Sequence, residues 1–167
     1  MSDDIVRVLE EQEARLRFPS LDLECIERVC REAESILEKL KAPCYIRAAV
    51  NGTVVHARCL PGASLNNQEW ARRKANLCER YWISSLHAVC RLSAGGKSLE
   101  SCGMDSADFG FSGGSFPILL PSGICVGSLT ISGLRGEEDH QIAAESIARV
   151  LGADIGTVVP YFSIPRD

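Results

Sequence analysis

Residues 113–134 read GGSFPILLPSGICVGSLTISGL. Two apolar segments, 118–120 and 124–131, lie on either side of a Pro-Ser-Gly break at 121–123, and the second is rich in β-branched residues. A break this short folds the second segment back on the first. The stretch therefore predicts a hairpin of two buried strands, around which the rest of the chain is organised.

Glycine-bearing bends lie in and beside this hairpin, at 113–114, 127 and 132–133. Glycine allows the backbone to take positive φ or to approach another group closely. Such bends can leave amide donors free for a ligand, or they can only form turns and tight strand packing. From the sequence both interpretations are open.

A second hairpin is predicted upstream, where Asn51-Gly52 separates the apolar segments 44–50 and 53–60. Asn-Gly is a strong signal for a two-residue turn, because both central positions of a type I′ turn need positive φ. We expect this hairpin to join the first one in a mainly antiparallel sheet.

Helical periodicity marks five segments, which are 3–16, 23–40, 66–81, 86–92 and 136–151. Asp22 is placed to cap the second helix, and Asn66, followed by Glu69, fits a capping-box start of the third. The predicted fold class is α/β in the broad sense, of the α+β type. It consists of a central, mainly antiparallel sheet flanked by helices.

The length of 167 residues predicts a single domain over 1–167, with an N-terminal helix within residues 1–20. The tail, 153–167, is apolar and broken by prolines, which suggests a subunit contact. The irregular stretch 97–111 is long enough to be a lid or another subunit contact.

Composition excludes several partners. The net charge is -4 and the acidic excess lies in residues 1–40, whereas nucleic-acid binding needs concentrated Lys and Arg. No apolar run approaches the ~20 residues that span a bilayer, and no secretory signal is visible, so we expect a cytoplasmic protein without membrane contact. The eight cysteines form no CxxC pair, which favours buried free thiols over zinc or disulfides, and no metal site is expected.

Candidate ligand-binding residues gather around the glycine bends in the sequence. They are Asn66, Trp70, Arg73, Lys74, Ser84, Ser85, Gly113, Gly114, Ser115, Ser132 and His140. A cleft that gathers Arg73, Lys74 and free amides would suit a carboxylate or a phosphate. No nucleophile elbow, P-loop, metalloprotease or dinucleotide motif appears.

His140 is the candidate catalytic residue. It cannot pair with its neighbour Asp139, because adjacent residues of a helix do not face each other. It can ligate a metal or haem iron, or it can be a surface histidine in the first turn of a helix. His56 likewise is either a ligand-facing or a half-buried strand histidine, and a Cys/His nucleophile pair is a further alternative.

Several motifs together resemble a known family. They are PGASLNNQEWARRK at 61–74, Ser84-Ser85, GGSFPI at 113–118, Ser132-Gly133-Leu134 and Asp139-His140. Over residues 5–152 the chain resembles a largely uncharacterised group of small cytosolic proteins related to the haem-degrading-domain superfamily, which includes HbpS-like and GlcG-like proteins. It departs from the group at Asn66, where Asp is frequent.

The resemblance implies an antiparallel sheet flanked by helices and assembly into dimers or higher rings. Wider relatives include haem-binding domains, which makes haem a possible cofactor. However, the first helices of this chain lack the histidine that serves as an axial ligand in some relatives, and only His56, His87 and His140 remain as candidates.

Three functions are compatible with the sequence. The first is a homo-oligomeric small-ligand-binding protein, in which an intersubunit pocket takes a small anion or a tetrapyrrole. The second is an enzyme that acts on haem or a small metabolite through His140 or a cysteine. The third is an oligomeric adaptor or chaperone-associated protein that contacts protein partners.

Overall fold

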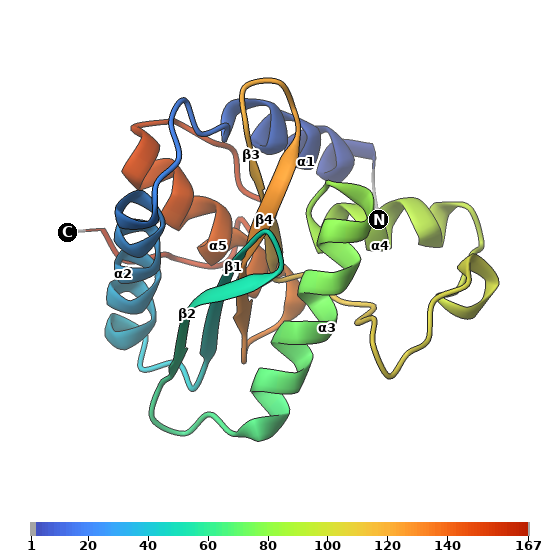
Figure 1. Ribbon diagram of the computed structural model, residues 1–167, viewed down its shortest axis with the longest axis horizontal. Coiled ribbons are helices and arrows are strands. Elements are labelled where there is room, and N and C mark those ends of the chain that lie inside the picture. The colour runs from blue at the N-terminus through green and yellow to red at the C-terminus, as the bar shows by residue number, and fades with distance from the viewer. Residues whose placement is uncertain (1–2, 167) are drawn as a thin grey trace.

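The computed structural model describes residues 3–166. Its elements, in chain order (Figure 1), are α1 (Asp3–Arg15), α2 (Leu23–Lys39), β1 (Tyr45–Val50), β2 (Thr53–Cys59), α3 (Leu65–Tyr81), α4 (Ser85–Ala94), the 3-10 turn η1 (Glu100–Cys102), β3 (Ser115–Leu119), β4 (Cys125–Ser132) and α5 (Gly136–Leu151). The helix predicted within residues 1–20 is α1. Residues 1 and 2 of that prediction, and residue 167 of the predicted tail, lie outside the described residues.

Both predicted hairpins are present, and they form one antiparallel sheet with the strand order β2-β1-β4-β3. The hairpins join through β1 and β4, where Ile46 lies opposite Ile131. Asn51 and Gly52 have φ values of 49° and 78°, so the turn uses the left-handed backbone that Asn-Gly favours. The predicted fold class is confirmed.

Alternation along β4 divides the sheet into an apolar and a polar face. Leu129 and Ile131 point to one face, and Ser128, Thr130 and Ser132 point to the other. On the apolar face, α2 and α5 close the main core with residues of three strands. Figure 1 shows α2 and α5 on one side of the sheet and α3 on the other.

The polar face of the sheet is buried under α3. Ser128 Oγ donates a hydrogen bond to Glu79 of α3 at 2.6 Å, and Thr130 Oγ1 donates to Ser115 Oγ at 2.8 Å. Buried hydroxyl groups are tolerated when they are hydrogen-bonded in this way. The fold thus places donor-rich strand residues directly beneath a helix that carries Lys74.

Close strand packing explains one of the glycine bends. A Cβ on Gly127 would overlap the carbonyl oxygen of Ala49 on β1. We expect Gly127→Ala to lower the free energy of unfolding by about 1–3 kcal/mol, because overpacking forces the strands apart. Urea denaturation measures this, with Gly95→Ala as the control at φ -84°, where the added methyl meets only ordinary contacts. Equal stability of the two variants would contradict the packing account.

The start of α3 differs from the prediction. The capping residue is Ser64, which has an extended backbone, and its N–H donates to Asn67 Oδ1 at 2.9 Å. Asn66 was placed at the cap, which is wrong; it lies in the first turn and is exposed. Asp22 does cap α2, since its Oδ1 accepts from Cys25 N at 2.7 Å.

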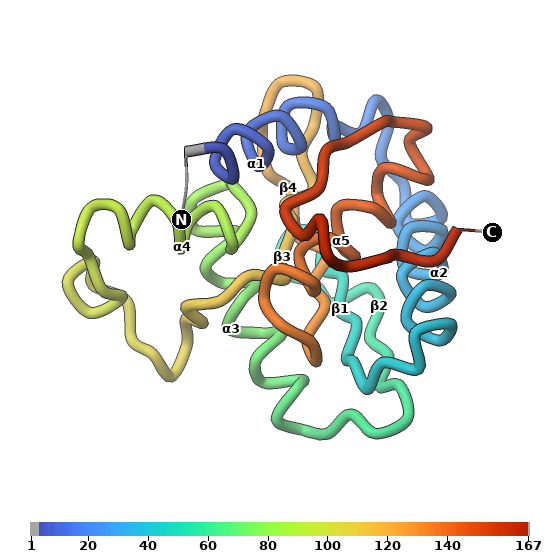
Figure 2. The backbone as a smooth tube through the Cα atoms, turned by 180° about the vertical axis from the view of Figure 1, so that it is seen from behind, coloured from blue at the N-terminus to red at the C-terminus, as the bar shows by residue number. Residues whose placement is uncertain are grey.

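The tail runs along the back of the molecule beside α1 and α5 (Figure 2). Val158 and Val159 are buried in a small cluster with Leu9 and Leu86, whereas Tyr161 is exposed. The tail therefore belongs in part to this chain's own core. A subunit contact through its exposed residues stays a prediction.

The predicted irregular stretch 97–111 contains η1 and is held by its own buried residues. Leu99 and Met104 pack with Leu77, Ala88 and Leu92. Within residues 3–166, no helix has the length and apolar character that crossing a membrane requires.

Candidate functional site

A buried ion pair lies between α3 and the start of α5. Lys74 Nζ is 2.8 Å from Asp139 Oδ2, and the two side chains are 5% and 0% exposed. The amides of Gly133 and Leu134 also donate to this carboxylate, at 3.2 and 3.0 Å. The bend at 132–133 thus binds an anion, but the anion is a side chain of the same chain.

Burial raises the pKa of Asp139 above its ordinary value, while Lys74 and the two amides act in the opposite direction. Both partners occur in the sequence motifs, Lys74 within 61–74 and Asp139 beside His140, but no spacing in the sequence indicates that they pair. The available signal was Lys74 itself, because a lysine within the apolar stripe of a helix needs a counter-charge when it is buried.

A cleft of about 210 Å³ opens beside the ion pair, and we call it the α3–β4 cleft. It is lined by Asn67, Trp70, Lys74, Ser112, Ser132, Gly133 and Leu134. Three predicted ligand-binding residues, Trp70, Lys74 and Ser132, therefore come together here. Asn67 takes the place that was predicted for Asn66.

Hydrogen-bond donors dominate the polar lining of the α3–β4 cleft. Lys74 Nζ carries three protons and has two acceptors, Asp139 and the carbonyl of Ile131 at 3.4 Å. Asn67 uses its Oδ1 to accept from Ser64, which leaves its NH2 group as a donor. Among residues 3–166, no carboxylate lines the cleft. The arrangement suits a ligand that is rich in acceptors.

Gly113 and Gly114 bring the Ser112 segment to the cleft. Gly114 has φ +130°, and a Cβ there would lie 2.5 Å from the carbonyl oxygen of Ile131 and 2.9 Å from Lys74 Nζ. A Cβ on Gly113 would lie 2.5 Å from the carbonyl oxygen of Gly136. These two glycines allow the backbone to pass between β4 and the start of α5.

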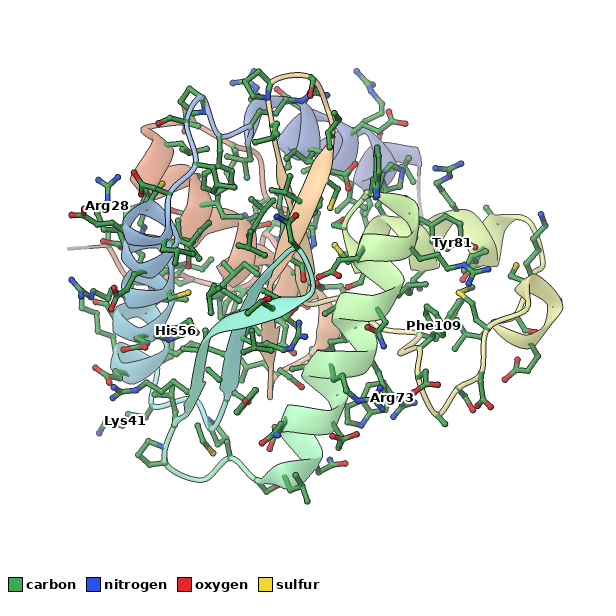
Figure 3. The ribbon with its side chains drawn as sticks, in the orientation of Figure 1. Arg28, Lys41, His56, Arg73, Tyr81 and Phe109 are labelled. Carbon is green, nitrogen blue, oxygen red and sulfur yellow. The ribbon has the colours of Figure 1, made fainter. Side chains whose placement is uncertain are left out.

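Arg73 does not share the cleft with Lys74. Its guanidinium stacks over the Trp70 ring at 4.2 Å, and its Nε is buried without a hydrogen-bond partner among the described residues. Figure 3 shows Arg73 on the side of α3 away from the sheet. Adjacent helical residues diverge by about 100°, so Arg73 and Lys74 leave α3 in different directions, and only Lys74 lines the cleft.

Three of the predicted residues make structural contacts away from the cleft. Ser84 Oγ accepts from His87 N at 3.2 Å and caps α4. Ser85 Oγ accepts from Ser115 N at 3.0 Å, and all three serines are fully buried. The Ser85 hydroxyl group thus joins α4 to β3, and burial leaves none of the three serines a surface for a ligand.

His140 is buried rather than exposed. Its Nε2 is 2.7 Å from Gln12 Oε1, its ring contacts Phe116, and its Nδ1 has no partner among residues 3–166. Burial, aided by the nearby His87, lowers the pKa of His140 to about 3. The alternative of a surface histidine is wrong, and a neutral buried imidazole has no route to a substrate in this chain.

The bond to His140 belongs to a network that sequence reasoning missed. Gln12 Nε2 donates to Gln141 Oε1 at 3.2 Å and to the carbonyl of Gly156 at 2.7 Å. Val158 N donates to the same Gln141 oxygen at 3.0 Å. The network joins α1, α5 and the tail, and the only signal in the sequence was a glutamine on the apolar face of the first helix.

The other two histidines are also paired. His56 Nε2 lies 2.8 Å from Glu34, across from β2 to α2 (Figure 3), and His87 Nδ1 lies 2.9 Å from Glu13. Among the described residues, no group of three His, Cys, Asp or Glu could hold a metal ion. His87 and His140 are buried, and His56 is the histidine with part of its side chain exposed.

The thiols give little support to nucleophilic chemistry. Burial raises the pKa of Cys30 and Cys44 to about 12 and also raises the pKa of Cys78, Cys90 and Cys125. A thiol must ionise to act as a nucleophile. These five cysteines consequently remain protonated near neutral pH.

Comparison with known proteins places the chain in a family. A family model described as "Haem degrading protein HbpS-like" matches residues 21–148. The chain belongs to the HbpS-like family. The match runs from α2 into α5 and includes both walls of the α3–β4 cleft, so the HbpS-like core contains the candidate site.

Relatives of this HbpS-like chain include bacterial UPF0303 proteins. The one from Rhizobium etli is 32% identical over 158 residues, covering 95% of this chain and 96% of the relative. The one from Azotobacter vinelandii is 35% identical over 141 residues, covering 84% and 85%. The family resemblance predicted from the motifs is confirmed.

Solved structures share the fold. The Ybr137w protein superposes with a TM-score of 0.80 at 26% identity, covering 88% of this chain and 87% of that one. PduOC, in its haem complex, gives a TM-score of 0.66 at 26% identity, covering 83% and 98%. HbpS gives 0.64 at 24% identity, covering 81% and 93%, and this last likeness shows the fold alone.

Proposed function

We propose that this HbpS-like chain is a small-ligand-binding protein whose α3–β4 cleft takes a small anion. The observation that carries the proposal is the lining of the cleft, where Asn67, Lys74 and serine hydroxyl groups meet and the described part of the chain contributes no carboxylate. Trp70 and Leu134 add apolar surface. Such a mixture of apolar walls and a few convergent polar groups is typical of ligand sites.

Homo-oligomer formation is part of this proposal, with a second subunit completing the cleft. Leu65 and Phe111 are 70% and 39% exposed, and each lies within two residues of a residue that lines the cleft. Exposed apolar side chains beside a cleft support a protein contact there. A solution mass of one chain, 18.2 kDa, would remove this part of the proposal.

A tetrapyrrole is the second candidate ligand, because PduOC is known in a haem complex and shares this fold. Two observations make a tetrapyrrole a less well supported ligand than a small anion. The cleft of about 210 Å³ is smaller than the roughly 300–1,000 Å³ of sites for drug-sized ligands. Of the three histidines, His87 and His140 are 5% and 0% exposed, which limits their access to haem iron. Native mass spectrometry with added haemin separates the two ligand classes.

Catalysis through His140 or the buried thiols finds no support, because His140 is buried and neutral and the buried thiols stay protonated.

We also propose a cytoplasmic location, which the eight free cysteines support, since thiols stay reduced there. An adaptor role stays a prediction.

Ligand binding can be followed through Trp70. In a Trp82→Phe background Trp70 is the single tryptophan, so its fluorescence reports on the α3–β4 cleft. We expect a saturable change with inorganic phosphate or malonate. Replacing Asn67 and Ser132 by Ala should weaken binding at least about tenfold, since each lost hydrogen bond costs ~1 kcal/mol.

Arg28→Gln is the matched control, because Arg28 is exposed on α2, on the opposite side of the sheet from α3 (Figure 3). It should leave the affinity unchanged. If neither anion changes the fluorescence, or if the double alanine variant binds as well as its parent, the small-anion proposal fails.

A further inference from the structure

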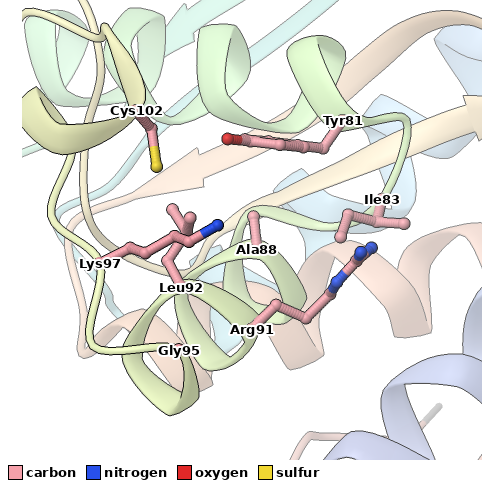
Figure 4. A pocket seen from close by; sticks show the side chains of 8 residues that line it. All are labelled: Tyr81, Ile83, Ala88, Arg91, Leu92, Gly95, Lys97 and Cys102. Carbon is pink, nitrogen blue, oxygen red and sulfur yellow. The ribbon is translucent and has the colours of Figure 1, made fainter.

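A second cleft lies at the other end of α3, and nothing in the proposed function uses it. It has a volume of about 200 Å³ and is formed by the last turn of α3, by α4 and by the loop that follows α4. We call it the α4 cleft, and its lining (Figure 4) is Tyr81, Ile83, Ala88, Arg91, Leu92, Gly95, Lys97 and Cys102.

Two cations face the α4 cleft without a counter-charge. Arg91 and Lys97 form no ion pair with any of the residues 3–166, and no carboxylate lines the cleft. Figure 4 shows Lys97 extending from the loop beneath the Tyr81 ring, and Arg91 reaching from α4 toward Ile83. Unpaired cations at a concave surface attract anionic groups.

The floor of the α4 cleft is apolar. Ala88 and Leu92 are 2% and 7% exposed and belong to a hydrophobic cluster, and Ile83 and the Tyr81 ring pack against that cluster. The cleft therefore offers an apolar surface next to two positive charges. A free inorganic ion would use only the charges and leave the apolar floor exposed.

The wall that the loop contributes is preformed. Leu99 and Met104 anchor the loop in the same cluster, and Arg80 donates to the carbonyl of Cys102 at 3.2 Å. Later in the loop, Asp108 forms an ion pair with Arg72 of α3, in which Arg72 Nη1 lies 3.0 Å from Asp108 Oδ1. A ligand does not have to order this wall when it binds, which favours affinity.

We propose that the α4 cleft binds a small organic anion, namely a carboxylate attached to a compact apolar body. Arg91 and Lys97 hold the carboxylate, the Tyr81 hydroxyl group is placed to donate to it, and Ile83, Ala88 and Leu92 contact the body. A volume of about 200 Å³ favours a ligand below drug size.

This site is separate from the α3–β4 cleft. Trp70 and Tyr81 mark the two clefts on the same helix, and they lie about 16 Å apart along its axis at ~1.5 Å per residue. The two clefts share no lining residue, so each can fail without the other.

Fluorine NMR with 4-fluorobenzoate tests the site in the full chain. We expect saturable broadening of the fluorine signal, and amide shifts in labelled protein that cluster at 81–97 rather than at Asn67 and Ser132. The double variant Arg91→Gln/Lys97→Gln should weaken binding at least tenfold, because it removes both charges that hold the carboxylate. Both side chains are exposed, so their replacement spares the core. Arg28→Gln is the control and should bind like the parent.

Two further probes separate charge from apolar contact. At the α4 cleft, as measured by displacement of 4-fluorobenzoate, the uncharged 4-fluorobenzyl alcohol and inorganic phosphate should each bind at least tenfold more weakly than 4-fluorobenzoate. The proposal is overturned if the alcohol or phosphate displaces 4-fluorobenzoate from the α4 cleft at equal concentration, or if the double variant keeps the affinity of the parent. Amide shifts centred on the α3–β4 cleft, or the absence of saturable binding, overturn it as well.

Discussion

Lys74→Met is expected to lower the free energy of unfolding by about 3–5 kcal/mol at pH 7, because it leaves the Asp139 carboxylate buried without its cation. Methionine keeps most of the volume of lysine, so the loss reports on charge rather than on packing. Equilibrium denaturation in urea measures it. A loss below about 1 kcal/mol would show that the ion pair is not needed to keep Asp139 buried.

The double variant Lys74→Met/Asp139→Asn is the control. Gly133 N donates to Oδ2 of Asp139 and Leu134 N donates to Oδ1, so the single asparagine oxygen can keep one of these two hydrogen bonds, and no buried charge remains. We expect it to be more stable than Lys74→Met alone. Burial already raises the pKa of Asp139, and loss of Lys74 raises that pKa further, so Lys74→Met should regain stability as the pH falls and the carboxyl is protonated in the folded state.

Acid should destabilise the protein through His140. The pKa of this imidazole is near 6.5 in the unfolded chain and about 3 in the folded one, so between these values only the unfolded chain binds the proton. Above pH 6.5, neutral His140 makes its full contribution to the free energy of unfolding. It is lost at about 1.4 kcal/mol per pH unit as the pH falls toward 3.

Urea denaturation at pH 7.5, 6 and 5 measures this slope in the parent and in His140→Gln. The difference between the two proteins cancels the pH dependence of all groups that they share. One of these groups is Asp139, whose raised pKa makes the protein more stable as the pH falls, opposite to the effect of His140. We expect the parent to lose about 2 kcal/mol more than His140→Gln between pH 7.5 and 5. Parallel slopes would mean that His140 is accessible to protons in the folded chain.

The fold follows from signals that act between near neighbours. Asn51-Gly52 specifies its own turn, the alternation along 127–132 specifies two sheet faces, and Asp22 caps the helix that it precedes. Each signal depends on backbone preferences within a few residues. The sequence alone was therefore sufficient for the hairpins, the helices, the antiparallel sheet and the family resemblance.

The site depended on contacts between distant residues. Lys74 meets Asp139 and His140 meets Gln12 only after α3, α5 and α1 pack around the sheet, and no local pattern encodes those distances. Packing also divided the predicted residues, leaving Trp70, Lys74 and Ser132 at a cleft and burying Ser84, Ser85 and His140. Residue types and their spacing determined this protein's fold, whereas tertiary packing decided which polar groups reach solvent, because burial is a property of the assembled layers and not of any one segment.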